Sequence, residues 1–394
     1  MITFDEATAL VGRAASPLAV ETVPIERAQG RVLARSVEAR VDSPPCNVSA
    51  MDGYALRDAD LAELPARLRV VGQSFPGDGF VGTLGKGECI RIFTGGPVPP
   101  GVDRVVIQEN VERDGDIALI GQGPGEARHI RRAGSDFRAG AVLLEPGRRL
   151  DARALVAAAG ADHGEIEVWR RPRLIVLGTG DELVEPGRAR STPAAIPESV
   201  SYGVAALAEA WGANTVGRRR LRDDLAAMSE AAAEAVAAAD LVVVTGGASV
   251  GDKDFAKPMF GEPLDLIFSK VAIKPGKPVW LGRLGTTLVM GLPGNPTSAL
   301  VTARLLLAPL LAGQTGRDPA EALRWRSARL AAALGPCGDR ETFVRARRED
   351  DAAIPLGNQD SGAQHSLAAA DWLIRRRAGA PAAGAGEIVE VLDF

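Results

Sequence analysis

Carboxylates, lysines and glycines that could act on a phosphorylated ligand gather in four segments of this 394-residue chain. The segments are residues 178–182, 245–254, 274–278 and 291–296. The first, second and fourth each follow a short apolar run typical of a buried strand, and in an α/β protein ligands bind beyond the carboxyl ends of such strands. Glycine lets the backbone approach a phosphate, and a helix that starts after Pro296 would favour an anion. Carboxylates interleaved with lysines are what an Mg²⁺–polyphosphate complex requires. The sequence therefore predicts a sheet edge that binds anions and a cation.

Lysine is rare in this chain and concentrated near that edge. Six of the 46 basic residues are lysines, so forty are arginines, and five of the lysines fall in one short window: Lys253, Lys257, Lys270, Lys274 and Lys277. A compact, rotatable ammonium suits phosphate or another oxyanion. Lys270 and Lys274 occupy alternate positions of a predicted strand, so we expect both to project to one face. The alternative is chance clustering on a solvent-exposed face.

The carboxylates also have simpler explanations. Asp223 and Asp224 precede a predicted helix and would cap its first turn. Asp181 and Glu182 could form only a turn. Asp52, which precedes Gly53, could likewise belong to a tight turn.

The strand and helix patterns predict several domains, because 394 residues exceed one ordinary core. Residues 4–15 have the pattern of a helix, and residues 43–147 contain short strands broken by glycine and proline, with a hairpin turn at Asp114 and Gly115. From residue 171 onward, strands alternate with helices of about 10 to 15 residues, which predicts a parallel or mixed sheet covered on both faces. Short strands at 342–347 and 387–392 predict a small all-β C-terminal domain.

Composition excludes several functional classes. The net charge of −4 argues against bulk affinity for nucleic acid or anionic membranes. We find no apolar segment approaching 18 residues and no secretory signal at the N-terminus, so we expect a cytoplasmic protein. The three cysteines and three histidines are dispersed, which fits neither a disulfide framework nor a zinc site. Any metal would be a hard cation held by oxygen ligands.

Six segments carry a resemblance to a known family: residues 49–55, 94–97, 178–183, 246–254, 273–278 and 292–296. Their order and spacing resemble the motif set of the bacterial molybdopterin molybdenumtransferases, a family that includes the gephyrin E domain. The agreement covers nearly the whole chain, including residues 364–370 near the C-terminus.

This resemblance implies a multi-domain α/β and β fold. It places an elongated N-terminal domain at residues 1–42 and 130–170, with a β-rich inserted domain at 43–129. A doubly wound, molybdopterin-binding α/β domain of the kind shared with molybdopterin adenylyltransferases would cover 171–320. A small β-barrel domain would cover 321–394.

The resemblance also implies an activity. Enzymes of this family insert molybdate into adenylylated molybdopterin, a pterin dithiolene joined to AMP, and release AMP with the help of Mg²⁺ or a similar cation. They act as homodimers whose cleft lies between the sheet domain of one subunit and the N-terminal region of the other. Partners would include molybdopterin adenylyltransferase and molybdoenzymes that accept the product.

Site residues follow from the matching motifs. The resemblance implies a catalytic role for Asp52, Thr94, Asp136, Glu182, Asp223, Asp254, Lys270 and Lys274. Three of these would hold the cation or position water: Glu182, Asp223 and Asp254. Lys270 and Lys274 would attract molybdate and stabilise charge on phosphate. Substrate-binding positions would be Gly180, Asp181, Gly246, Gly247, Ser249, Gly251, Lys277, Pro293, Gly294, Asn295 and Pro296.

One segment departs from the family pattern. Where the family commonly has Asp-Ser/Thr-Asn before a helix, residues 196–200 contain Glu198 in place of the aspartate and no asparagine. This departure keeps open a non-catalytic carrier or scaffold that binds molybdopterin. A nucleotide-handling relative, such as the adenylyltransferase or a CinA-like pyrophosphatase, is a further alternative. The N-terminal region with Asp52, Thr94 and Asp136 counts against that last interpretation.

Overall fold

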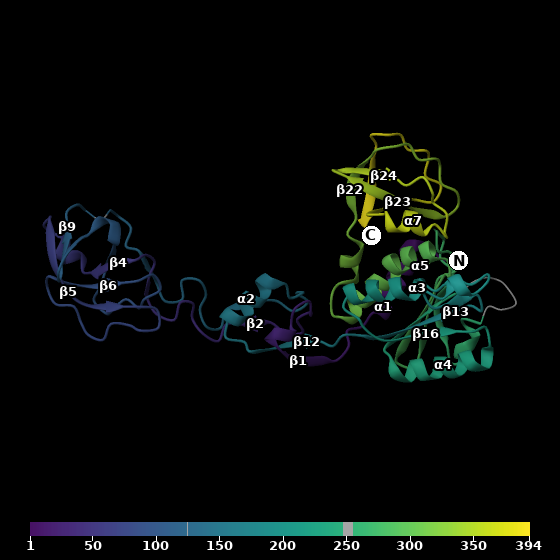
Figure 1. Ribbon diagram of the computed structural model, residues 1–394, viewed down its shortest axis with the longest axis horizontal. Helices are drawn as coiled ribbons and strands as arrows, with labels where there is room; N and C mark the ends of the chain where they lie inside the picture. The colour runs from purple at the N-terminus through teal and green to yellow at the C-terminus, as the bar shows by residue number, and fades with distance from the viewer. Residues whose placement is uncertain (124, 247–254) are drawn as a thin grey trace.

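The computed structural model describes residues 1–123, 125–246 and 255–394, and three regions follow one another along its long axis (Figure 1). A β-rich region lies at one end. A narrow connecting region lies in the middle. The large α/β sheet and the C-terminal strands lie together at the other end.

The β-rich region is a six-stranded sheet with the order β7-β4-β6-β5-β9-β8. Its strands are β4 (Gly53–Leu56), β5 (Ala66–Ser74), β6 (Glu88–Ile92), β7 (Arg104–Ile107), β8 (Glu112–Asp114) and β9 (Ile117–Ile120). The predicted hairpin at Asp114 and Gly115 is confirmed, since β8 and β9 pair antiparallel across it. Buried apolar side chains such as Leu56, Ile90 and Ile120 form the core of this region.

The middle region joins segments from both sides of the β-rich insertion. Here β1 (Val20–Pro24) pairs antiparallel with β12 (Glu165–Trp169), and β2 (Val37–Glu38) pairs with β11 (Val142–Leu144). Closer to the insertion, β3 (Val48–Ser49) pairs with β10 (Ile130–Arg131). Helix α2 (Ala152–Gly160) packs on these strands, and its cap, Asp151, accepts a hydrogen bond from the backbone of Ala154 at 2.9 Å. The chain therefore leaves and re-enters the middle region through paired strands.

The large sheet has the order β16-β13-β17-β21-β20-β18. Its strands are β13 (Arg173–Thr179), β16 (Asn214–Leu221), β17 (Leu241–Thr245), β18 (Asp265–Ser269), β20 (Trp280–Leu284) and β21 (Thr287–Leu292). Strands β16, β13, β17 and β21 are parallel, whereas β20 runs antiparallel to both neighbours. The predicted mixed sheet is confirmed.

Helices cover both faces of this sheet, as a doubly wound fold requires. Leu174, Val176 and Val243 face a core with α1 (Phe4–Ala14), α3 (Val200–Ala210) and the helix after β21. The alternate residues Ile175 and Leu177 face α4 (Leu225–Ala238) on the other side. Side chains alternate between the two faces because successive residues of a strand point in opposite directions.

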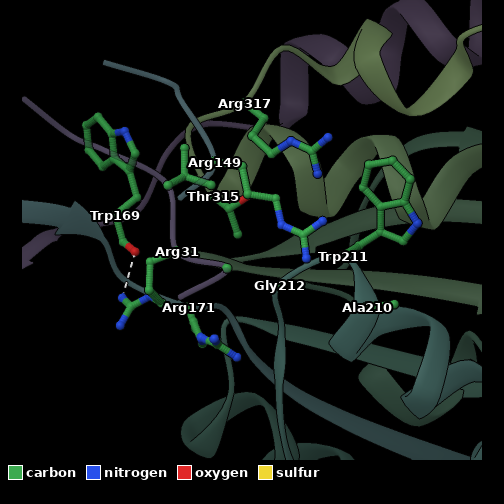
Figure 2. A pocket seen from close by; sticks show the side chains of 11 residues that line it. Arg31, Arg149, Trp169, Arg171, Ala210, Trp211, Gly212, Thr315 and Arg317 are labelled. Atoms are coloured by element: carbon green, nitrogen blue, oxygen red, sulfur yellow. Dashed lines mark hydrogen bonds between the residues drawn. The ribbon is translucent and has the colours of Figure 1, made fainter. Parts of the chain in front are cut away.

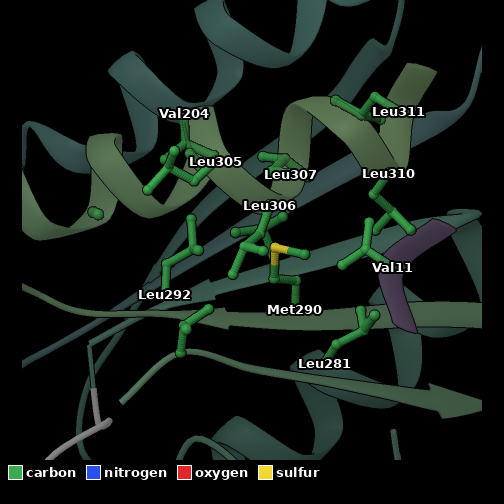
Figure 3. Close-up of a cluster of buried hydrophobic side chains, with 14 of the residues drawn as sticks. Val11, Val204, Leu281, Met290, Leu292, Leu305, Leu306, Leu307, Leu310 and Leu311 are labelled. Atoms are coloured by element: carbon green, nitrogen blue, oxygen red, sulfur yellow. The ribbon is translucent and has the colours of Figure 1, made fainter. Parts of the chain in front are cut away.

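A continuous helix follows β21 and fills one side of the core (Figure 3). It consists of α5 (Pro296–Thr302), a π-helical turn (Ala303–Leu307) and α6 (Ala308–Gln314). By length and composition this helix could cross a membrane, which contradicts our expectation that no apolar segment is so long. However, 89% of its apolar window is buried, as in a core helix of a globular protein.

Helix α1 packs on the large sheet rather than on the middle region. Thr3 and Glu6 form a capping box at its start, and Phe4, Ala7 and Val11 are buried in the sheet core. Asp5 pairs with Arg375 of the C-terminal strands at 2.7 Å. The apolar face of this helix therefore has its packing partners beyond residue 170, although the helix lies within residues 1–42.

The C-terminal strands close into a five-stranded barrel, as predicted. They are β22 (Arg326–Leu330), β23 (Glu341–Glu349), β24 (Ala352–Pro355), β25 (Trp372–Arg376) and β26 (Ile388–Asp393). The order runs β23-β24-β22-β26-β25, and β25 pairs back on β23. Short α7 (Gln364–Ala368) lies between β24 and β25.

The single strand that we expected to contain both Lys270 and Lys274 is wrong. Strand β18 ends at Ser269, and Lys270 has a φ of 68°, which turns the chain out of the sheet. Two-residue β19 (Ile273–Lys274) then joins the barrel by pairing with β23. Lys270 and Lys274 therefore do not share one face of one strand.

Candidate active site at the edge of the sheet

The parallel strands end together at one edge, where the strand order changes direction. From β13 the chain crosses by α3 to β16 on one side, and then by α4 to β17 on the other side. Their carboxyl ends are Thr179, Leu221 and Thr245, with Leu292 beside them at the end of β21. A reversal of this kind leaves a crevice in which α/β proteins bind ligands.

A cleft of about 690 Å³ opens at this edge. It brings together eight of the predicted site residues: Gly180, Glu182, Asp223, Gly246, Pro293, Gly294, Asn295 and Pro296. The remaining wall comes from residues 196–200, and Gly362 and Gln364 reach it from the barrel. All four predicted segments thus reach the cleft, although residues 274–278 contribute only Pro278 to its lining.

Two glycines allow the loops of this cleft to pack backbone against backbone. Gly246 has a φ of 95°, and a Cβ there would lie 2.6 Å from the carbonyl oxygen of Thr179. A Cβ on Gly294 would lie 3.2 Å from the Cα of Gly246. This part of the cleft is consequently lined by backbone, which can approach a phosphate closely.

Two carboxylates line the cleft. The Glu182 side chain is exposed and folds back so that its oxygens lie 2.8 Å from the Cβ position of Gly180. Asp223 also lines the cleft, and its backbone N–H donates to the Asp181 carboxylate at 3.2 Å. Among residues 1–123, 125–246 and 255–394, no group of three or more acidic, histidine or cysteine side chains is placed to hold a metal ion.

Five residues highlighted in the sequence lie outside the described part of the chain: Gly247, Ser249, Gly251, Lys253 and Asp254. The third predicted cation ligand, Asp254, is one of them.

The three predicted site lysines, Lys270, Lys274 and Lys277, are exposed and stand beside the cleft rather than in its lining. Their segment reaches the cleft through Pro278. Lys274 instead lines a separate recess of about 260 Å³. Arg340 and Arg376 line the same recess, so it is basic.

Asp52, Thr94 and Asp136 lie away from the cleft of their own chain. Asp52 immediately precedes β4, at the far end of the molecule from the large sheet (Figure 1). Thr94 donates two hydrogen bonds to the Asp52 carboxylate, from its backbone N–H at 2.7 Å and from its hydroxyl at 2.8 Å. These bonds, aided by Arg91, hold the pKa of Asp52 below its usual range. Asp136 is exposed in the middle region.

The segment that departs from the family pattern builds one wall of the cleft. Glu198 is buried, with 5% of its surface exposed, and accepts hydrogen bonds from the backbone and hydroxyl of Ser201. It therefore holds the first turn of α3 in place. Upstream, β15 (Ile196–Pro197) pairs with β14 (Leu183–Val184), which connects this wall to the Glu182 loop.

Sequence reasoning missed the residue that fixes the barrel to the cleft. Arg345 on β23 is 1% exposed and donates to the Thr297 hydroxyl at 3.0 Å and to the carbonyl oxygens of Asn358 and Asp360 at 3.2 and 3.0 Å. Ser361 in the same loop accepts a hydrogen bond from the Asn295 side chain at 2.9 Å. The sequence feature that could have indicated a buried arginine is its position between two apolar strand residues, Val344 and Ala346.

Comparisons with known proteins agree with this geometry. The chain matches the MoeA N-terminal region (domains I and II) at residues 2–161, a probable molybdopterin binding domain at 175–313 and the MoeA C-terminal region (domain IV) at 327–394. Molybdopterin molybdenumtransferase 2 of Mycobacterium tuberculosis is 34% identical, over 97% of this chain and 96% of its own length. The chain belongs to the molybdopterin molybdenumtransferase family.

Further relatives of the family support the same assignment. The molybdopterin molybdenumtransferase of Haemophilus influenzae is 36% identical over 80% of this chain and 78% of its own length. A molybdopterin biosynthesis MoeA protein from Pyrococcus horikosii superposes with a TM-score of 0.86 at 30% identity, covering 100% of this chain and 99% of the other. Because the similarity includes both ends of the chain, it does not favour an isolated adenylyltransferase or pyrophosphatase domain.

Proposed function

We propose that this protein inserts molybdate into adenylylated molybdopterin and releases AMP. The observation that carries the proposal is the cleft at the sheet edge, where Glu182, Asp223, Gly246 and residues 293–296 meet in a chain of this family. The backbone around Gly246 and Gly294 would accept the phosphates and the pterin. The start of the helix at Pro296 adds a favourable dipole for an anion.

We propose that Glu182 and Asp223, together with Asp254, bind Mg²⁺. Glu182 and Asp223 line one cleft, and their hard oxygen donors suit this ion. When bound, Mg²⁺ would offset the charge of the phosphoanhydride. The carboxylates would also orient the water that cleaves it.

The basic groups beside the cleft would bring in molybdate. Lys270, Lys274 and Lys277 are exposed in the segment that reaches the cleft at Pro278, and Arg340 and Arg376 line one recess with Lys274. Molybdate is a tetrahedral dianion, so this surface would raise its local concentration. Neutralising Lys274 should therefore weaken molybdate binding more than binding of the pterin.

A genetic test separates this enzyme from a non-catalytic carrier. Lys274→Ala or Asp52→Ala should fail to restore cofactor synthesis in a cell that lacks molybdate insertion, whereas the wild type should restore it. Full restoration by either variant, at equal protein level, would remove the catalytic assignment.

We propose a homodimer, because Asp52 and the cleft lie at opposite ends of one chain (Figure 1). In a two-fold dimer, the N-terminal region of a second copy would complete each cleft. We further propose that the protein acts in the cytoplasm, with an adenylyltransferase supplying its substrate and molybdoenzymes taking its product.

Mixing two inactive variants should restore activity if clefts form between subunits. Asp52→Ala and Glu182→Ala, unfolded and refolded together in equal amounts, should give roughly a quarter of the wild-type rate. Half of the dimers would be mixed, and one of the two clefts in each would be intact. Mixing Glu182→Ala with Asp223→Ala, which alter the same side of the cleft, should restore nothing. Equal inactivity of both mixtures would contradict the shared cleft.

Thr94→Val should move the acid side of the pH–rate profile to higher pH. The hydroxyl hydrogen bond stabilises the charged Asp52 carboxylate and lowers its pKa, so losing the bond raises this pKa. Asp52 would then be protonated at a higher pH as the solution is acidified. Thr94→Ser keeps the hydroxyl and should leave the profile in place. Coincident profiles for wild type and Thr94→Val would exclude ionised Asp52 from the reaction.

A further inference from the structure

Four arginines gather around a narrow recess where the middle region meets the large sheet (Figure 2). We call them the arginine cluster: Arg31, Arg149, Arg171 and Arg317. They come from the segment before Val32, the loop before α2, the linker between β12 and β13, and the residues after α6. None of the residues that line this recess lines the cleft described above.

The positive charges of the cluster are only partly compensated. Arg31 pairs with Glu21, and Arg317 pairs with Glu321 at 2.9 Å. Within the described ranges, the guanidinium groups of Arg149 and Arg171 have no carboxylate partner within salt-bridge distance. Partial burial and the like charges of Arg31 and Arg149 lower the pKa of Arg171. Glu21, which pairs with Arg31, partly offsets the charge of Arg171, but neither Arg149 nor Arg171 has an ion pair of its own within the described ranges.

The two tryptophans that line the recess already pack against other residues of the chain. The ring of Trp211 carries the Arg317 guanidinium at 4.8 Å and the Arg304 guanidinium at 5.4 Å. Gly316 packs so tightly on Trp169 that a Cβ there would lie 2.0 Å from the ring. The recess itself has only about 10 Å³ of space, roughly enough for one water molecule, so a ligand would sit at its mouth. There it would meet N–H donors rather than a free aromatic face, which favours a compact oxyanion over a nucleoside base.

The recess opens into a groove of about 780 Å³ that Arg149 and Arg171 also line. Arg148, Arg153 and Arg324 add positive charge along this groove. The carboxylates in it are Asp151, which pairs with Arg148 and Arg153, together with Glu209 and Glu321. An anion at the mouth of the recess would meet Arg149 and Arg171, and anything attached to it could extend into the groove.

We propose that the arginine cluster binds a phosphate group, free or as a monoester, at a site separate from the cleft. The planar guanidinium presents paired N–H donors that match phosphate oxygens. The proposal does not depend on the function proposed for the cleft.

Calorimetric titration of the intact protein with inorganic phosphate, at constant ionic strength, tests the proposal. The wild type should give a saturable heat that weakens as salt increases. The double variant Arg149→Gln, Arg171→Gln should bind at least roughly tenfold more weakly, since each charge-assisted hydrogen bond contributes on the order of tenfold in affinity. If the double variant does not show a melting transition, the single Arg149→Gln variant replaces it in the test. Arg149 is exposed, so we expect this single variant to fold.

Two controls locate the binding. Arg35→Gln removes an exposed arginine of the same region that lines neither cavity and should not change the titration. Lys274→Ala alters the basic surface beside the cleft and should also leave it unchanged. Titration with β-glycerophosphate distinguishes free phosphate from a phosphate monoester as the ligand. If β-glycerophosphate binds more tightly than inorganic phosphate, the site is assigned to a monoester.

Three results would overturn the proposal. The first is no saturable heat with either phosphate. The second is binding that Lys274→Ala abolishes while the Arg149 and Arg171 variants retain it. The third is a change in oligomeric state of the arginine variants without any phosphate binding, which would assign these arginines to a contact between subunits.

Discussion

Arg345→Met is expected to lower the free energy of unfolding by about 3 kcal/mol and to weaken ligand binding in the cleft. The variant removes a buried guanidinium that satisfies the Thr297 hydroxyl and the carbonyl groups of Asn358 and Asp360. Each buried polar group left without a partner costs about 1–3 kcal/mol. Urea denaturation followed by circular dichroism measures the loss.

Arg345→Met should also make the loop at residues 358–363, which lines one side of the cleft, less rigid. The loop at residues 358–363 supplies Gly362 to the cleft and pairs Ser361 with Asn295. Without Arg345, the described hydrogen bonds between this loop and the residues around Pro296 are the two made by Ser361 and a longer one, 3.4 Å, from the Thr297 hydroxyl to the Ala363 carbonyl oxygen. The Michaelis constant for the pterin substrate should therefore rise. Arg347→Met is the matched control, because Arg347 lies on the same strand but is exposed. Equal stability of the two variants would contradict the positioning role of Arg345.

Gly246→Ala should reduce affinity for AMP by roughly tenfold or more and cost about 2 kcal/mol of stability. A Cβ at this position meets the Thr179 carbonyl oxygen at 2.6 Å, and the φ of 95° is strained for any side chain. The loop must shift, and the backbone surface for the phosphates shifts with it. Isothermal titration with AMP and thermal denaturation measure the two effects.

Gly178→Ala provides the control for that substitution. Gly178 lies near the end of the neighbouring strand β13, but a Cβ there would meet its nearest neighbours at 3.6 Å, which is ordinary contact. This variant should bind AMP like the wild type. Similar losses in both variants would show that the close approach at Gly246 has no special role.

Much of the sheet edge was predictable because its loops follow buried strands directly. The apolar runs before Gly180 and Gly246 predicted strands, and the shared edge of parallel strands then placed those residues with Asp223 and Pro293. The short strands near the C-terminus were enough to predict a small all-β domain there. Its closure by β25 on β23 depends on pairing between residues far apart in the sequence.

The predictions that were wrong concern residues whose positions depend on contacts between distant parts of the sequence. A local sequence pattern does not encode such contacts. Lys270 takes a positive φ while the next residue, Val271, bridges to Ile2 near the N-terminus, and this interrupts a segment that otherwise reads as one strand. Helix α1 pairs its apolar face with a sheet formed about 160 residues later. Glu198 replaces the aspartate of the family pattern, yet its carboxylate accepts a hydrogen bond from the backbone of Ser201 in the first turn of α3.

Arg345 and the arginine cluster show a related limit. In a chain with forty arginines, a single arginine carries no sequence signal of its own. Burial distinguishes Arg345, and a shared recess brings Arg149 and Arg171 together with two further arginines. Both properties arise only from tertiary structure.

AMP release from adenylylated molybdopterin by the purified protein, with Mg²⁺ and with or without molybdate, tests the central claim most directly. We expect release that requires the protein, increases with molybdate and yields a molybdenum cofactor able to activate an apo-molybdoenzyme. The Asp52→Ala variant should release no AMP above the rate without protein. AMP release that is independent of molybdate, or equal in the absence of the protein, would contradict molybdate insertion as the function of this cleft.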